Sequence, residues 1–335
     1  MELQTKVHAS HFVEWAANKP EVLVLSADLT SSVEVDQFQK AYPKRFISLG
    51  LTEQNMLSIA GGLAREGFSP WVHTFAVFIY RRSYDQIVDS VAYPHLPVRM
   101  VGFLPGIVTP GGITHQAIED ISIMRTIPNM TVFEVGDATD VESVLDVAQA
   151  VNGPVYIRML RGEIPRLFAA SEPLCYNQAR QLSAGSDITL FSSGICTEEA
   201  MRATSVLRER GVSIQHMHVS TLKPFSDPTV LEAASQPRFG VVTMENHTIL
   251  GGLGTAVAEV MAENGIGKKL VRIGLNDTFA HGASRPYLMK HYGLDALALV
   301  RKIEGLLGED LKIDESDLAA VRLQAVHSAA KAEAL

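Results

Sequence analysis

Short runs of aliphatic and β-branched residues alternate with helical patterns along the whole chain, and this alternation limits the possible folds more than any other feature. Strands are expected at 22–25, 46–49, 70–74, 98–103, 130–134 and 155–159, and again at 188–191, 213–219, 240–244 and 270–273. Helical patterns stand between many of them, at 8–18, 138–151, 197–210, 227–235 and 253–264. Strands that alternate with helices predict parallel sheets with crossover helices.

The length of the chain predicts two domains, because it has 335 residues and a domain takes roughly 150. Hydrophobic residues make up 47% of the chain and charged residues 20%, which is typical of a folded protein and not of a disordered one. Between 173 and 186 the hydrophobic periodicity is weak, as in a linker. The sequence therefore predicts two doubly wound α/β domains, at 1–172 and 187–335, joined by a linker at 173–186.

Charge and cysteine content exclude several classes of protein. The net charge is −8, so the overall basic surface of a nucleic-acid-binding protein is missing. The two cysteines, Cys175 and Cys196, cannot build a disulfide framework or a paired-cysteine metal site. No apolar run approaches the ~18 residues of a membrane span, and the opening MELQTKVHASHFVEWAANKP lacks the apolar core of a secretory signal. We expect a cytoplasmic protein without a membrane or nucleic-acid partner.

One carboxylate stands out in the string Gly50-Leu51-Thr52-Glu53-Gln54-Asn55-Met56. Glu53 follows the strand expected at 46–49 and begins the next helix, for which Thr52 is the expected N-cap. Because open α/β sheets bind ligands at the carboxyl ends of their strands, Glu53 is a candidate catalytic group. The alternative is an ordinary first-turn acid that the helix dipole favours.

The stretch GLTEQNMLSIAGGLAREGFSPWVHTFAVFIYRRSYDQI, at 50–87, resembles the pyrimidine-binding domain of the transketolase family of thiamine diphosphate enzymes. The resemblance extends to SADLTSS, GGITHQAIEDISIMRTIPNM and GPVYIRMLRG. In the second half, DITLFSSG and TMENHTILGGLG resemble the C-terminal domain of the same family. The similarity thus covers nearly the whole chain.

The resemblance implies a set of cofactor-binding residues. Glu53 matches the carboxyl group that hydrogen-bonds the pyrimidine ring and shifts its tautomer by proton transfer. Phe78 and Phe75 match rings that stack on the pyrimidine; core packing is the alternative for both. Asp28 and Leu29 match the loop that supports the bent cofactor, although a turn at the end of a strand would also explain Asp28.

It also implies substrate-binding residues. His115, in a glycine-bearing loop, matches a histidine that contacts the hydroxyls of the donor and carries protons, for which a near-neutral pKa is suitable. Arg161 matches an arginine near the acceptor, His73 stands where a small hydroxyl residue is common, and Arg81 and Arg82 are candidates for the entrance. An exposed loop histidine and solvated surface arginines are the alternatives.

The sequence departs from the family in two places. The GDG motif and following Asn that hold diphosphate and metal are missing, and Gly136-Asp137-Ala138 predicts only a turn and a helix N-cap. We therefore expect no metal ligand in this chain and a separate subunit that holds the diphosphate and Mg²⁺. Apolar or small residues replace polar sugar- and phosphate-binding groups at Val7, Phe103, Leu104 and Gly111. The distal end of the substrate is thus left open: phosphate, sulfonate, carboxylate or neutral.

The function implied is that of the small subunit of a split transketolase, which transfers a two-carbon ketol unit from a ketose to an aldose. Two copies of this chain, themselves a homodimer, would form a heterotetramer with two diphosphate-binding subunits. The alternatives are a 1-deoxyxylulose-phosphate-synthase-like enzyme, which the string YDQI favours, the β subunit of a decarboxylating 2-oxo-acid dehydrogenase, and a non-catalytic remnant. The donor, the acceptor and the pathway stay open.

Overall fold

A seven-stranded sheet organises the first half of the chain in the computed structural model, which describes residues 3–321. Its order is β12-β6-β7-β5-β4-β2-β3, and all neighbours are parallel except β12 and β6. The strands are β2 (Val22–Ser26), β3 (Phe46–Ser48), β4 (Ser69–Phe75), β5 (Arg99–Phe103), β6 (Thr131–Glu134), β7 (Val155–Met159) and β12 (Thr221–Lys223). Strands β2, β4, β5, β6 and β7 are entirely buried, as expected where helices cover both faces of a parallel sheet.

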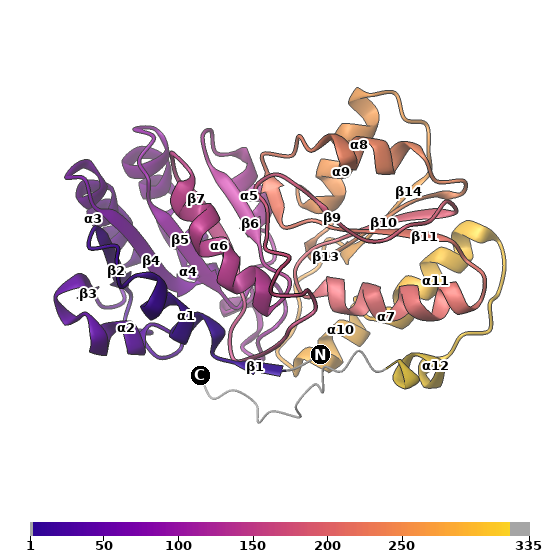
Figure 1. Cartoon of the computed structure of the whole chain (residues 1–335), viewed down its shortest axis with the longest axis horizontal. Helices are drawn as coiled ribbons and strands as arrows, with labels where there is room; N and C mark the ends of the chain where they lie inside the picture. Colours follow the sequence, from indigo (N-terminus) through magenta and orange to yellow (C-terminus); the bar gives the residue numbers. More distant parts are fainter. Residues whose placement is uncertain (1–2, 322–335) are drawn as a thin grey trace.

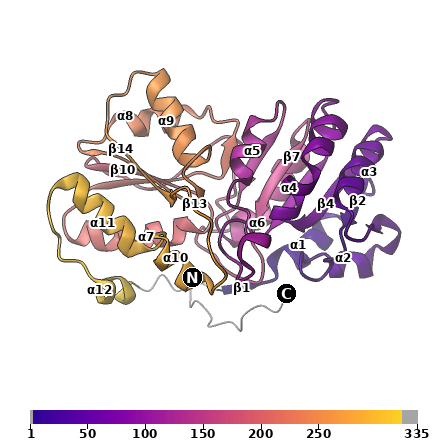
Figure 2. The same ribbon diagram turned by 180° about the vertical axis from the view of Figure 1, so that it is seen from behind.

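Helices cover both faces of this sheet. Figure 1 has α1 and α6 in front, and Figure 2 shows α3, α4 and α5 on the opposite face. The helical segments are α1 (Val7–Trp15), α2 (Asp36–Ala41), η1 (Pro43–Arg45), α3 (Glu53–Arg65), α4 (Ala76–Gln86), the π-helix η2 (Ile87–Ala92), η3 (Gly112–Thr114), α5 (Asp120–Thr126) and α6 (Ala138–Ala150). The predicted doubly wound domain is confirmed.

A second, five-stranded sheet organises the rest of the chain in the order β14-β13-β10-β11-β9. Its strands are β9 (Arg180–Ser183), β10 (Ile188–Ser192), β11 (Ile214–His218), β13 (Gly240–Thr248) and β14 (Leu270–Leu275). Helices α8 (Pro228–Ser235) and α9 (Leu253–Glu263) cover one face, and α7 (Cys196–Glu209) and α11 (Ala296–Leu307) cover the other (Figure 1). The remaining elements are α10 (Arg285–His291), α12 (Glu315–Ala320) and the strand pair β1 (Leu3–Thr5) and β8 (Glu163–Pro165).

Four short strands, β1, β8, β9 and β12, were not expected from the sequence, and two of them affect the domain organisation. Arg180–Ser183, inside the segment predicted as a linker, forms β9 at the edge of the second sheet. Thr221–Lys223 follows β11 in sequence but pairs with β6 of the first sheet as β12. Both strands are short and contain polar residues, RQLS and TLK, so they lack the apolar run that marks the other strands in the sequence.

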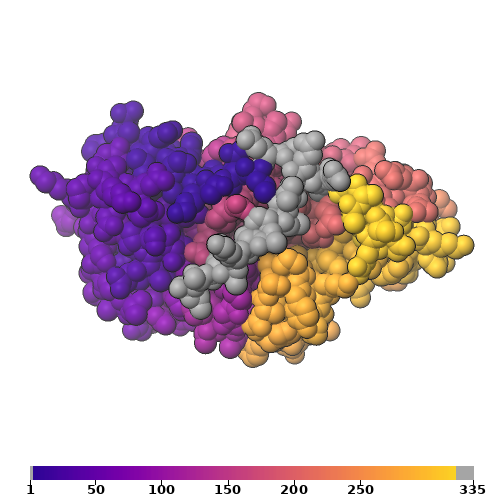
Figure 3. Space-filling model, turned by 90° about the horizontal axis from the view of Figure 1, so that it is seen from below, coloured from indigo at the N-terminus to yellow at the C-terminus, as the bar shows by residue number. Residues whose placement is uncertain are grey.

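The two domains lie side by side along the long axis (Figure 3), and buried charges join them. Arg158 on β7 is fully buried, and it donates to Asp120 at 2.8 Å, to Glu134 and to the Asn246 carbonyl of the second domain at 3.2 Å. Because a buried charge is costly unless it is paired, this network makes the domain contact selective for one arrangement.

Candidate active site

Glu53 is the first residue of α3 and lies at the carboxyl edge of the first sheet, after β3. Its side chain is 1% exposed. Thr52 occupies the N-cap position as predicted, but its hydroxyl donates to the Leu49 carbonyl at 2.7 Å and does not cap the helix. The carboxylate of Glu53 instead accepts hydrogen bonds from Arg82, whose Nη1 lies 3.0 Å from each of its oxygens.

Two aromatic rings lie at the junction of β4 and α4. Phe75 is the last residue of β4 and Phe78 is in the first turn of α4, so the two do not share one helix. Their ring centroids are nevertheless 5.8 Å apart. Phe75 is buried, whereas Phe78 is partly exposed. Phe78 therefore offers the more accessible ring face for a planar ligand.

His115 packs edge-on against both rings, at centroid distances of 6.0 Å from Phe75 and 5.5 Å from Phe78. Its Nδ1 lies 2.8 Å from the hydroxyl of Thr114. Partial burial and the positive charge of Arg82 lower the pKa of His115 below its ordinary value. The lowered pKa favours the neutral imidazole, which can accept a proton.

Both domains hold the loop that carries His115. Arg81 on α4 donates to the Ile113 carbonyl at 2.7 Å and to Glu119 at 2.9 Å. The buried amide of Gln116 donates to the Thr109 carbonyl at 3.2 Å and to the His281 carbonyl of the second domain at 3.3 Å.

Close backbone packing adds to these hydrogen bonds. A Cβ atom added at Gly282 would lie only 2.5 Å from the Pro110 carbonyl oxygen. Gly282 thus allows the second domain to lie directly against the loop. Neither Gln116 nor Gly282 was predicted from the sequence; the only available signal was the glycine in the string HGAS.

Arg161 follows β7, and its guanidinium carbon lies 5.6 Å from the centroid of the Phe75 ring. It donates to the Ser32 carbonyl at 2.5 Å. Six of the predicted residues are thus connected by direct contacts, and we call them the active-site cluster. They are Glu53, Phe75, Phe78, Arg82, His115 and Arg161.

The other predicted site residues lie outside this cluster. His73 is fully buried; its Nε2 lies 3.1 Å from Nε2 of His8 and its Nδ1 lies 3.1 Å from the Trp71 carbonyl, so a contact with substrate would require these bonds to change. Asp28 is exposed after β2 with a positive φ of 66°, and Leu29 is half-buried beside it. Arg81 contacts the His115 loop and not the rings.

The prediction that Gly136-Asp137-Ala138 is a turn with a helix cap is confirmed. Asp137 caps α6 by accepting from the Asp140 amide at 2.8 Å, and it also accepts from the amides of Leu167 and Phe168. Burial, followed by the charge of Asp140, raises the pKa of Asp137 to about 6. Among residues 3–321 no three His, Cys, Asp or Glu side chains are grouped as metal ligands, and no helix there is long and apolar enough to cross a membrane.

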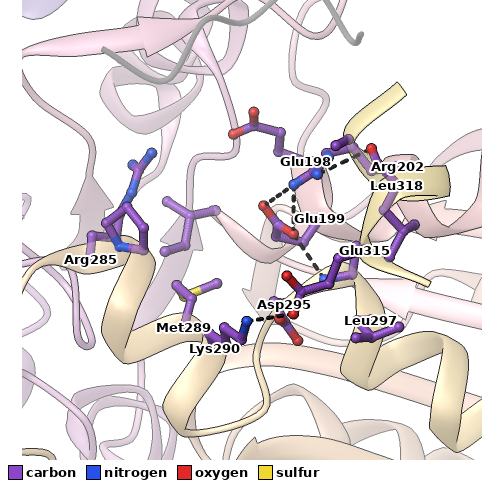
Figure 4. Close-up of a pocket in the computed structure, with 14 residues that line it drawn as sticks. Glu198, Glu199, Arg202, Arg285, Met289, Lys290, Asp295, Leu297, Glu315 and Leu318 are labelled. Atoms are coloured by element: carbon purple, nitrogen blue, oxygen red, sulfur yellow. Dashed lines mark hydrogen bonds and ion pairs between the residues drawn. The ribbon is translucent and has the colours of Figure 1, made fainter. Parts of the chain in front are cut away.

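A separate hollow of about 290 Å³ lies in the second domain between α7, α10, α11 and α12 (Figure 4). Its charged side chains are largely paired with one another: Arg202 donates to Glu199 at 3.0 Å, and Lys290 donates to Glu315. No member of the active-site cluster lines it. The hollow is therefore separate from the candidate site.

Comparison with known proteins agrees with this architecture. Residues 4–166 match the transketolase pyrimidine-binding domain, and residues 177–299 match the transketolase C-terminal domain. An uncharacterised transketolase family protein of Sinorhizobium fredii is 39% identical over 89% of this chain and 88% of its own. A 6-deoxy-6-sulfo-D-fructose transketolase subunit of a Clostridium species is 39% identical over 86% of this chain and 89% of its own.

The solved structure of a split-gene transketolase, in an inactive β4 tetramer, superposes with a TM-score of 0.81 at 35% identity, over 90% of this chain and 97% of the other. 1-Deoxy-D-xylulose-5-phosphate synthases match at lower identity, 30–32%, and the chain spans about half of their length. The chain therefore belongs to the transketolase family. Within that family it consists of the pyrimidine-binding domain followed by the C-terminal domain.

Proposed function

We propose that this chain is the pyrimidine-binding subunit of a two-chain transketolase that transfers a two-carbon ketol unit from a ketose to an aldose. The observation that carries the proposal is the active-site cluster, in which a buried carboxylate, an accessible aromatic face and a neutral histidine adjoin at one sheet edge. The lower identity of the deoxyxylulose-phosphate synthases favours this function over the synthase alternative.

The cluster fits the aminopyrimidine half of thiamine diphosphate. Glu53 offers a buried carboxyl group that can share a proton with a ring nitrogen, and Phe78 offers a face for stacking. When bound, the cofactor supplies an electron sink for the two-carbon unit. The diphosphate and Mg²⁺ would be held by the separate subunit.

The chain's own residues then have distinct tasks. Glu53 exchanges a proton with the pyrimidine ring, a step for which a positioned acid or base typically contributes 10²–10⁴-fold. His115 accepts a proton from a donor hydroxyl as the carbon–carbon bond breaks. Arg81 positions His115 by holding the Ile113 carbonyl, and Asp28 and Leu29 would support the cofactor from the next loop.

For the substrate we propose a ketose with an anionic distal group. Arg161 lies near the rings and provides a guanidinium, which binds sulfonate, carboxylate or phosphate by paired hydrogen bonds. The Clostridium relative is named for a sulfofructose, which makes a sulfonate the first anion to test. His73 and Arg82 stay predictions as substrate ligands.

For the assembly we propose a homodimer of this chain within a heterotetramer in the cytoplasm. Large apolar side chains are exposed close to the cluster, with Leu51 65% and Ile113 39% exposed, and such side chains favour an interface. The β4 tetramer of the split-gene relative is consistent with self-association. Analytical ultracentrifugation that shows a monomer at micromolar concentration would refute the homodimer.

The test is turnover by this chain mixed with the diphosphate-binding subunit, thiamine diphosphate and Mg²⁺, over a panel of sulfonated, phosphorylated and neutral ketoses. We expect release of a shortened aldose and a loss of about 10²–10⁴-fold in Glu53→Gln. Glu66→Gln, at the exposed end of the same helix, is the matched control. Carbon dioxide released from a 2-oxo acid would instead favour the synthase or dehydrogenase alternatives, and no turnover with any donor would favour a remnant.

A further inference from the structure

Arg82 lies between the two groups that the cofactor would need. Its Nη1 is 3.0 Å from both oxygens of Glu53, and its guanidinium carbon lies 4.4 Å from the centroid of the Phe78 ring. The side chain of Arg82 is 49% exposed, whereas that of Glu53 is 1% exposed. The arginine therefore covers the carboxylate from the solvent side.

A guanidinium and an aminopyrimidine present similar chemistry to these partners. Each is planar and delocalised, can stack on an aromatic face and can donate N–H hydrogen bonds to a carboxylate. Arg82 makes both kinds of contact at once, with the acceptor and the ring that the proposed function assigns to the pyrimidine. One carboxylate and one ring face cannot serve both groups in the same way.

We infer that Arg82 occupies the aminopyrimidine position in this chain and is an intramolecular competitor of the cofactor. The inference rests on the proposed function. The pair compensates the buried charge of Glu53 until the cofactor arrives. Arg82 then leaves Glu53 and Phe78 and turns to the solvent, which its half-exposed, flexible side chain allows.

The exchange is reversible because the contacts involved are weak. A partly exposed ion pair and a cation–π contact at the surface each contribute little, together equivalent to about three- to thirty-fold in a binding constant. Removing Arg82 is therefore expected to tighten aminopyrimidine binding by that factor, without any new contact.

The experiment is calorimetric titration of the full chain, without its partner, with 4-amino-5-hydroxymethyl-2-methylpyrimidine. Arg82→Ala is expected to bind this pyrimidine about three- to thirty-fold more tightly than the unchanged chain. Arg82→Lys keeps the charge but not the planar group, and its affinity should lie between the two. Arg65→Ala removes an equal charge from the far end of α3 and is the matched control. Glu53→Gln added to Arg82→Ala should remove most of the gain.

Equal or weaker binding by Arg82→Ala would overturn the inference, and weaker binding would make Arg82 a ligand of the pyrimidine. A second readout separates this failure from failure of the proposed function. In the enzyme reconstituted with its diphosphate-binding subunit, Arg82→Ala should lower the half-saturating concentration of thiamine diphosphate by the same factor. If the unchanged enzyme turns over and Arg82→Ala saturates at the same concentration, only the role of Arg82 is refuted. If the reconstituted enzyme has no turnover and no variant binds the pyrimidine, both the role of Arg82 and the proposed function are refuted.

Discussion

Gly282→Ala tests whether the second domain positions His115. The added methyl would lie 2.5 Å from the Pro110 carbonyl oxygen, and real Cβ atoms essentially never come closer than 3.0 Å. The two backbones must therefore separate by at least 0.5 Å. Such a movement would lengthen the 3.3 Å hydrogen bond from Gln116 to the His281 carbonyl beyond useful range.

Two costs follow from this separation. Overpacking of this kind typically costs about 1–3 kcal/mol, and loss of the hydrogen bond adds about 1 kcal/mol. Because a 1 Å misplacement near an active site can cost roughly 10²-fold in rate, a shift of about half that size is expected to lower kcat by about tenfold. The KM should change less, since Arg161, which would hold the anionic end of the substrate, is untouched.

The assay compares Gly282→Ala with Gly267→Ala, which makes the same change in the same domain where nothing lies within 4 Å of the new methyl. Thermal unfolding gives the stability, reconstituted turnover gives kcat and KM, and an NMR titration reports on His115. A variant that is less stable but has an unchanged kcat and an unchanged His115 titration would refute the positioning role and leave only a packing contact.

Three further predictions concern charge. Arg158→Met leaves two buried carboxylates without their partner, so denaturant unfolding should show a loss of about 3–5 kcal/mol; a loss under 1 kcal/mol would contradict the buried network. Burial lowers the pKa of His73 and of His216 to about 3. The unfolded histidines bind protons near pH 6.5 and the folded ones do not, so their contribution to stability is complete above pH 6.5 and falls as the pH drops, by about 2 kcal/mol for each histidine at pH 5. His216→Gln should therefore lose about 2 kcal/mol less between pH 7 and pH 5 than the unchanged protein. Equal losses in the variant and in the unchanged protein would count against this. Arg82→Ala should raise the pKa of His115, because the arginine charge lowers it; an unchanged NMR titration would show that the two do not interact.

Much of the fold was predictable because long, buried strands have a strong local pattern. β2, β4 and β7 are rich in apolar, aromatic and β-branched residues, and each was predicted to within two residues. β9 and β12 were missed because their stability comes from pairing with strands far away in sequence, which no local window contains.

The residues of the candidate site likewise include some that the sequence predicted and some that it did not. Glu53, Phe78 and His115 lie in strings that resemble a family, and the structure brings them together. Their supports were not predictable, because Gln116 and Gly282 act through a contact between domains that is long-range in sequence. The pairing of Arg82 with Glu53 was not predictable either, because it depends on the tertiary structure: 29 positions separate the two residues in the sequence.

The return of β12 to the first sheet has a consequence for how the chain can be divided. A fragment that ends before residue 173 would leave β6 as a bare sheet edge, open to association with other chains. It would also lose His218, which lies 2.9 Å from the buried carboxylate of Asp140. The unit of cooperative folding is therefore larger than either family domain, and an attempt to express the first domain alone should yield aggregates instead of a folded protein.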